Sequence, residues 1–134
     1  MASTGMKIVA AALIGVLAAV VLYSALTFPS LVVDLQVNFA VGVESETKEF
    51  DVPFLQDEAL VEVAVMNGTA LWLAVITDSN SSEVWSHTKA QGDSTTYTSG
   101  WIALPSGHYS FTFGTIGIGN LDSNVKVTSK GGFW

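Results

Sequence analysis

The sequence contains no cysteine, and its five basic residues are all lysine. Without cysteine, the chain has no disulfide, no thiolate metal site and no cysteine nucleophile. Against those five lysines stand 12 acidic residues, so the formal net charge is −7. Nucleic acids and phosphate groups are usually held by basic clusters and by the guanidinium fork of arginine. This composition therefore argues against a nucleic-acid partner.

Charge is also missing locally, because no charged residue occurs between Lys7 and Asp34. Residues 8–26 form one apolar run that would be roughly 28 Å long as a helix, at about 1.5 Å per residue. That length is close to the thickness of the hydrocarbon core of a bilayer. The sequence therefore predicts an N-terminal tail and transmembrane-type helix over residues 1–30, followed by one domain over residues 31–134.

The apolar run has three interpretations: a retained membrane anchor, a cleaved signal peptide, or a buried helix of a soluble protein. A signal peptide has a shorter apolar region and a small-x-small cleavage site. Cleavage after Ala25 would place bulky Tyr23 at the minus-three position, and cleavage after Thr27 would place Thr at minus one. We therefore favour a retained anchor. Lys7, the one cation before the run, predicts that residues 31–134 are extracytoplasmic.

One face of the predicted helix carries small residues, Ala11, Gly15 and Ala19, at intervals of four. Such a stripe lets a second helix approach closely. Alanine is also common in membrane helices, so the stripe could arise by chance. The predicted partners are membrane lipid and either another protein or a second copy of the chain, through this helix.

The period of the apolar residues changes to two after the helix, with Val33, Leu35, Val37 and Phe39 alternating with polar neighbours. This alternation is typical of a half-buried strand. Further strands are predicted, with weaker or mixed patterns, at residues 47–54, 59–66, 69–77, 83–89, 94–104, 108–113 and 124–129. Seven to eight short antiparallel strands with regularly spaced turns predict a mainly β domain, a β-sandwich.

Three local signals refine this prediction. Asn67-Gly68 lies between two strongly apolar runs and predicts a two-residue hairpin, with both strands near the middle of the domain. Gly100 predicts a bulge in the strand at residues 94–104. Residues 114–120 are rich in glycine and are predicted to form a loop.

Asn67 and Asn80 each begin an Asn-x-Ser/Thr triplet in a predicted turn on the exported side. Such triplets are glycosylation acceptors in a cell that has the machinery, although they also arise by chance in chains rich in serine and threonine.

Trp85 and Trp101, with Trp72 and Tyr97, could form a stacking platform for a sugar or a contact with a partner. The alternative is that these aromatic residues pair within the core and across strands. Phe133 and Trp134 follow two glycines at the end of the sequence. These two aromatic side chains could fill a groove on a neighbouring molecule or pack on their own sheet.

No cofactor, metal site or catalytic group is predicted. His87 and His108 are the only histidines, and a zinc site needs three or four ligands. Asp78, Asn80 and Ser82 resemble the start of a calcium loop, but the glycine and the bidentate glutamate that such a loop requires are missing. A belt of acidic residues along residues 44–62 is interpreted as a solvated surface that protects a sheet edge.

The plan of a short N-terminus, one apolar helix and one acidic β-sandwich resembles archaeal type IV pilin-like proteins and the single-pass accessory proteins of the archaeal swimming filament. The resemblance implies that the helix packs in a filament core, which would suit the stripe of small residues. No Lys-Gly, Arg-Gly or Lys-Ala pair precedes the apolar run. Residues 104–111, LPSGHYSF, also resemble the strand that opens with LPxGxYxF in GOLD-type and related accessory sandwiches.

These observations lead to one principal functional hypothesis. The protein is expected to be a non-enzymatic, single-pass membrane protein that serves as a structural or accessory subunit of a surface or membrane assembly. One alternative is a pilin-like filament subunit, and another is a tethered carbohydrate-binding module.

Overall fold

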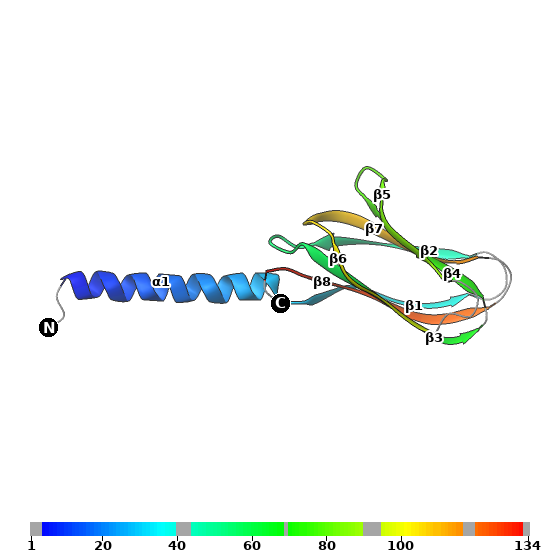
Figure 1. Cartoon of the computed structure of the whole chain (residues 1–134), viewed down its shortest axis with the longest axis horizontal. Helices are drawn as coiled ribbons and strands as arrows, with labels where there is room; N and C mark the ends of the chain where they lie inside the picture. Colours follow the sequence, from blue (N-terminus) through cyan, green and yellow to red (C-terminus); the bar gives the residue numbers. More distant parts are fainter. Residues whose placement is uncertain (1–3, 40–43, 69, 90–94, 117–119, 133–134) are drawn as a thin grey trace.

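The computed structural model describes residues 4–39, 44–68, 70–89, 95–116 and 120–132. The chain begins with one long helix, α1 (Thr4–Thr27), and continues as a β domain (Figure 1). The eight strands are β1 (Ser30–Phe39), β2 (Ser45–Val52), β3 (Glu58–Gly68), β4 (Leu71–Asp78), β5 (Glu83–Thr88), β6 (Thr96–Ala103), β7 (Gly107–Ile116) and β8 (Leu121–Lys130).

The strands form two four-stranded sheets, with the orders β1-β8-β3-β6 and β2-β7-β4-β5. All pairings between them are antiparallel. Among these strands, β4 and β5 are the one pair that is consecutive in sequence and adjacent in a sheet; every other connection crosses from one sheet to the other. Eight strands connected in this way form a jelly roll. The predicted fold class, an apolar helix followed by an antiparallel sandwich of seven to eight strands, is confirmed.

The hairpin predicted at Asn67-Gly68 is wrong. β3 pairs with β8 and β6, whereas β4 pairs with β7 and β5 in the other sheet. Both strands are therefore central, as predicted. Each is hydrogen-bonded along both edges to strands of its own sheet, so β3 and β4 do not pair with each other. Gly68 has a φ of 108° and lies against the backbone of Asn120, where an added Cβ would be 2.2 Å from the carbonyl oxygen. The glycine turns the chain out of one sheet and into the other.

Two further local predictions have different outcomes. A register shift between β3 and β6 and a φ of 66° at Gly100 confirm the predicted bulge. The predicted loop at residues 114–120 begins too early, because β7 continues through Gly114 to Ile116. Gly114 pairs with Ser45 and lies so close to it that an added Cβ would be 2.9 Å from the Ser45 Cβ. This glycine is needed for packing between strands rather than for a turn.

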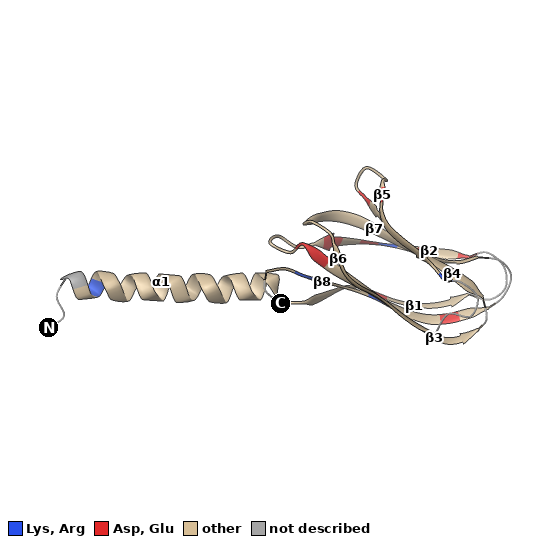
Figure 2. Cartoon of the chain, in the orientation of Figure 1, with Lys and Arg blue, Asp and Glu red and all other residues tan. Residues whose placement is uncertain are grey.

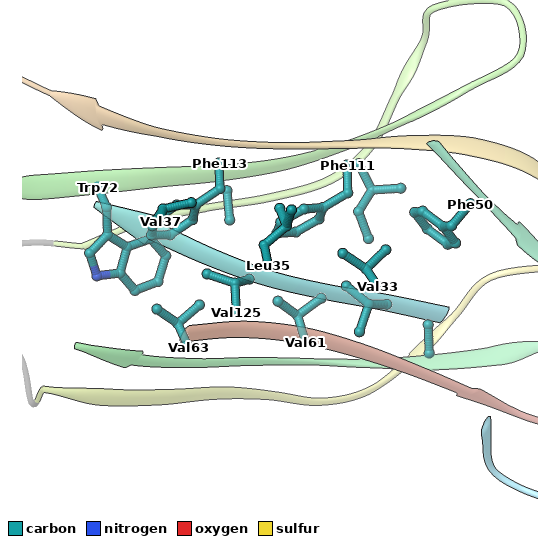
Figure 3. Close-up of a cluster of buried hydrophobic side chains, with 14 of the residues drawn as sticks. Val33, Leu35, Val37, Phe50, Val61, Val63, Trp72, Phe111, Phe113 and Val125 are labelled. Atoms are coloured by element: carbon teal, nitrogen blue, oxygen red, sulfur yellow. The ribbon is translucent and has the colours of Figure 1, made fainter. Parts of the chain in front are cut away.

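The core lies between the two sheets, and Figure 3 shows aromatic side chains of one sheet meeting branched aliphatic side chains of the other. Trp72, Phe111 and Phe113 are almost completely buried, and the rings of Trp72 and Phe113 have centroids 5.4 Å apart. The alternating residues of β1 are buried from Val33 to Phe39, as predicted. Leu104 belongs to this core, and the Tyr109 hydroxyl donates a hydrogen bond to the Pro105 carbonyl oxygen at 2.6 Å. The burial of Leu104 and Phe111 and the hydrogen bond from Tyr109 to Pro105 explain why these four residue types occur in the pattern LPSGHYSF of residues 104–111.

Candidate functional site

The helix α1 lies outside the sandwich and extends from one end of it (Figure 1). It is the one helix of the described chain that is long and apolar enough to cross a membrane, over Met6–Thr27, and none of its most apolar window is buried. Figure 2 shows basic colour only near its N-terminal end and no acidic colour along it. The interpretation of the apolar run as a helix buried in the core of this chain is therefore wrong. Its length and composition suit a membrane anchor or a signal sequence.

The end of α1 is joined to the sandwich by the side chain of Gln56, which is 4% exposed. Gln56 Nε2 donates hydrogen bonds to the carbonyl oxygens of Leu26 at 3.0 Å and Phe28 at 3.2 Å. The last carbonyl groups of a helix have no partner within the helix. Gln56, from the connection between β2 and β3, therefore supplies an amide donor to the end of α1.

The C-terminal strand completes this junction. The buried hydroxyl of Ser129, in β8, donates to Gln56 Oε1. The backbone N–H of Gly131 donates to the carbonyl oxygen of Thr27 at 2.9 Å, and the fully buried Thr27 hydroxyl donates to the carbonyl oxygen of Tyr23 at 2.7 Å. Buried polar groups that are fully paired hold one geometry. The helix is thus fixed to the sandwich by the β2–β3 connection and by the segment that follows β8.

Gly131 is enclosed by the same junction. A Cβ added there would be 2.2 Å from the carbonyl oxygen of Leu55 and 2.7 Å from the Gln56 Cα. Because both neighbours are backbone atoms, no side-chain movement could make room. Glycine is required at this position for the β2–β3 connection and the end of β8 to meet.

Charged and aromatic side chains lie next to the junction on the outer face of the first sheet. Lys130 Nζ is 3.4 Å from Glu58 Oε2 and lies over the Trp101 ring, 4.3 Å from its centroid. The indole of Trp101 is 42% exposed. This cation–π contact gives Trp101 a structural role within its own sheet.

An exposed charged pair lies on the other sheet at the same end of the sandwich. His108 Nδ1 is 2.7 Å from Asp51 Oδ1, and the two residues are directly paired between β7 and β2. This hydrogen bond is the largest cause of a raised pKa of His108, and the charges of Asp51 and Glu49 add to it, whereas desolvation lowers it. The pair stabilises the edge strand β2 when His108 is protonated.

The structure places the other predicted site residues as follows. Ala11, Gly15 and Ala19 lie exposed on α1, and a Cβ added to Gly15 would meet nothing within 4 Å. Asn67 and Asn80 are both exposed. Asn80 lies in the β4–β5 turn, where its backbone N–H donates to Asp78 Oδ1 at 2.9 Å.

Trp85 and Trp101 are not brought together into one platform. Trp85, in β5, packs with its ring centroid 6.5 Å from that of Tyr97, and Tyr97 stacks on His87 at 3.9 Å. Because β5 and β6 are edge strands of different sheets, this aromatic cluster joins the two sheets along one side. Phe133 and Trp134 lie outside the described residues. Among the residues that the structure describes, no group of three potential ligands could hold a metal ion.

The fold and the junction define a class of protein, a jelly-roll sandwich with an apolar N-terminal helix attached through buried polar contacts. Neither the protein-family models nor the curated proteins give a match to the chain. One similar solved structure is that of infectious bursal disease virus Gx strain, with a TM-score of 0.38 and 12% identity. The match covers 81% of this chain and 32% of the other. The chain thus spans about a third of the matched chain, and the match carries no argument about function.

Proposed function

We propose that the protein is a non-enzymatic, single-pass membrane protein that holds its sandwich on the extracytoplasmic side as a structural or accessory subunit of a larger assembly. The observation that carries this proposal is the junction between α1 and the sandwich. A signal peptide is removed from the mature protein, so its end has no need of hydrogen bonds from a folded domain. Here Gln56 and Gly131, from two distant parts of the domain, bond to the last turn of the helix and the residue after it.

The surface of the helix supports the same proposal. The large apolar side chains of α1 are exposed around its circumference, with exposed fractions from 38% to 68%. Apolar surface on this scale is covered by lipid or by other helices. A subunit anchored in this way presents the sandwich in a fixed orientation to its partners.

Membrane extraction combined with intact mass tests the proposal. The full chain is expressed, its membranes are washed at alkaline pH, and the mass of the retained protein is measured. We expect the protein to remain in the membrane with α1 intact. Recovery of a soluble protein that lacks residues 1–25 or 1–27 would contradict the proposal. Purification in mild detergent then identifies the co-purifying subunits of the assembly.

A pilin-like filament subunit is the second candidate. Figure 1 shows α1 extending along the long axis of the sandwich, and this extended shape suits a helix in a filament core with the sandwich outside. Negative-stain microscopy distinguishes the two candidates: long polymers support the filament, whereas discrete complexes of fixed stoichiometry support the accessory subunit. Replacing Gly15 with leucine should disrupt either assembly if the small-residue face of α1 packs on another helix, and Ile14→Leu serves as the matched control.

A further inference from the structure

We propose that residues 53–55, the tip of the connection between β2 and β3, insert Phe54 into the headgroup boundary of the bilayer that α1 crosses. This inference rests on the proposed membrane anchorage of α1. It assigns a lipid-contacting surface to the sandwich itself, separate from the helix. The partner is the polar–apolar boundary of a lipid bilayer.

The exposure of Phe54 is the first observation. Its side chain is 73% exposed, whereas the phenylalanines of the core, at positions 39, 50, 111 and 113, are at most 7% exposed. Leu55 beside it is 38% exposed, and residues 53–55 carry no charge. An uncharged Pro-Phe-Leu tip with an exposed aromatic ring suits the region where a bilayer changes from polar to apolar.

The depth of this tip follows from the junction. Met6–Thr27 contains 22 residues, or about 33 Å of helix at 1.5 Å per residue, slightly more than a hydrocarbon core of about 30 Å. The last turn of α1 therefore lies at the membrane boundary. Gln56 bonds to the carbonyl oxygens of Leu26 and Phe28, so it lies at that level, and Phe54 is two residues away. Figure 1 shows the β2–β3 connection at the end of the sandwich that meets α1.

The backbone of the tip is held in an uncommon conformation. Leu55 has a φ of 70°, in the left-handed region that branched residues rarely adopt. The contacts that hold it are its close packing against Gly131 and the hydrogen bonds of the neighbouring Gln56. Such conformations persist where the surrounding structure determines them, and they are frequent at functional sites.

The charged neighbours limit how deeply the tip can enter. Asp51 and His108 line a hollow of about 420 Å³ together with Phe54, and Asp57 is exposed on the other side of Gln56. Charged groups are costly in the hydrocarbon core but remain hydrated among headgroups. The proposal therefore places Phe54 at the boundary and Asp51, Asp57 and His108 above it.

Spin labels on single cysteines test this proposal, and the absence of native cysteine makes each label unique. Three full-chain variants are placed in phosphatidylcholine vesicles: Phe54→Cys, Met66→Cys and Val16→Cys. Met66 is the matched control, because it is 66% exposed and lies near the far end of β3. Val16, 61% exposed on α1, reports on the anchor itself. Collisions with oxygen mark lipid, and collisions with a water-soluble nickel chelate mark water.

We expect the ratio of oxygen to nickel collisions at position 54 to be several-fold higher than at position 66. A ratio at position 54 equal to that at position 66, with position 16 in lipid, would overturn the inference and leave the anchor intact. Low collision rates with both reagents at position 54 would indicate a protein contact and would also overturn it. Nickel access at position 16 would instead show that the proposed anchorage itself is wrong.

Discussion

Gln56 is the residue on which most of the junction contacts converge. Its amide donates to two backbone carbonyl oxygens near the end of α1 and accepts a hydrogen bond from Ser129. Removing such a buried amide leaves each of its partners desolvated and unpaired. The sequence offers no sign of this role, because Gln56 lies in a short connection between two strands and has no periodic pattern around it.

Replacing Gln56 with leucine should therefore destabilise the protein by about 1–3 kcal/mol, because the Leu26 and Phe28 carbonyl groups and the Ser129 hydroxyl would lose a partner. The free energy of unfolding can be measured by urea denaturation in detergent, followed by tryptophan fluorescence. Gln36→Leu is the matched control, since Gln36 is exposed on β1 and its replacement should change stability by only about 0.5 kcal/mol. Equal losses in the two variants would contradict a special role for Gln56.

His108 makes a pH-dependent contribution to the stability of the folded protein. Its pKa is raised above the ordinary value of 6.5 chiefly by the hydrogen bond to Asp51. The folded protein therefore holds the proton more tightly than the unfolded chain does. The stabilising contribution is fully present below pH 6.5 and is lost as the pH rises through the raised pKa.

The Asp51→Asn variant should lower the pKa of His108 toward its ordinary value, because the carboxylate that accepts the hydrogen bond is removed. The titration of the His108 ring can be followed by NMR, with Asp122→Asn on the other sheet as the control. An unchanged His108 pKa in the Asp51→Asn protein would show that the hydrogen bond to Asp51 is not the cause of the raised pKa.

At the scale of the elements, the sequence predicts the kind of each segment better than its partners. The apolar run of α1, the alternation of β1 and the bulge at Gly100 are local patterns, and each is found in the structure. The Asn67-Gly68 signal predicts a turn, but a turn does not determine which strands pair. In a jelly roll the partners of β3 and β4 come from distant segments, such as β8 and β7. The sequence does not predict the junction for the same reason, because the junction joins residues 26–28, 56 and 129–131.

A substitution at Gly131 tests the close backbone contact between two elements, the β2–β3 connection and the end of β8. Gly131→Ala should lower the free energy of unfolding by about 1–3 kcal/mol, because the new methyl group would overlap with the backbone of Leu55 and Gln56. Gly15→Ala is the control, since an added Cβ there meets nothing within 4 Å. Denaturation midpoints of the two variants give the comparison, and a Gly131→Ala protein as stable as the parent would mean that this contact is absent in solution.

At the scale of the whole molecule, an extended apolar helix carries a β-sandwich whose exposed charge is mainly acidic (Figure 2). Hydrogen bonds from Gln56 and Gly131 to backbone carbonyl oxygens of residues 26–28 join the two parts at one end of the sandwich. Composition alone indicates an apolar N-terminal segment and an acidic domain. The fixed orientation of one relative to the other depends on tertiary contacts that no local pattern contains.

The most direct test of this account is the topology of the intact protein in living cells. Met6 and Met66 are both about two-thirds exposed, at 67% and 66%, and they lie at the N-terminal end of α1 and in the sandwich. Single-cysteine variants Met6→Cys and Met66→Cys are treated with a maleimide that cannot cross membranes. The account predicts labelling of the Met66→Cys protein on intact cells and of the Met6→Cys protein only after permeabilisation. Labelling of both variants on intact cells, or release of the labelled sandwich into the medium, would contradict it.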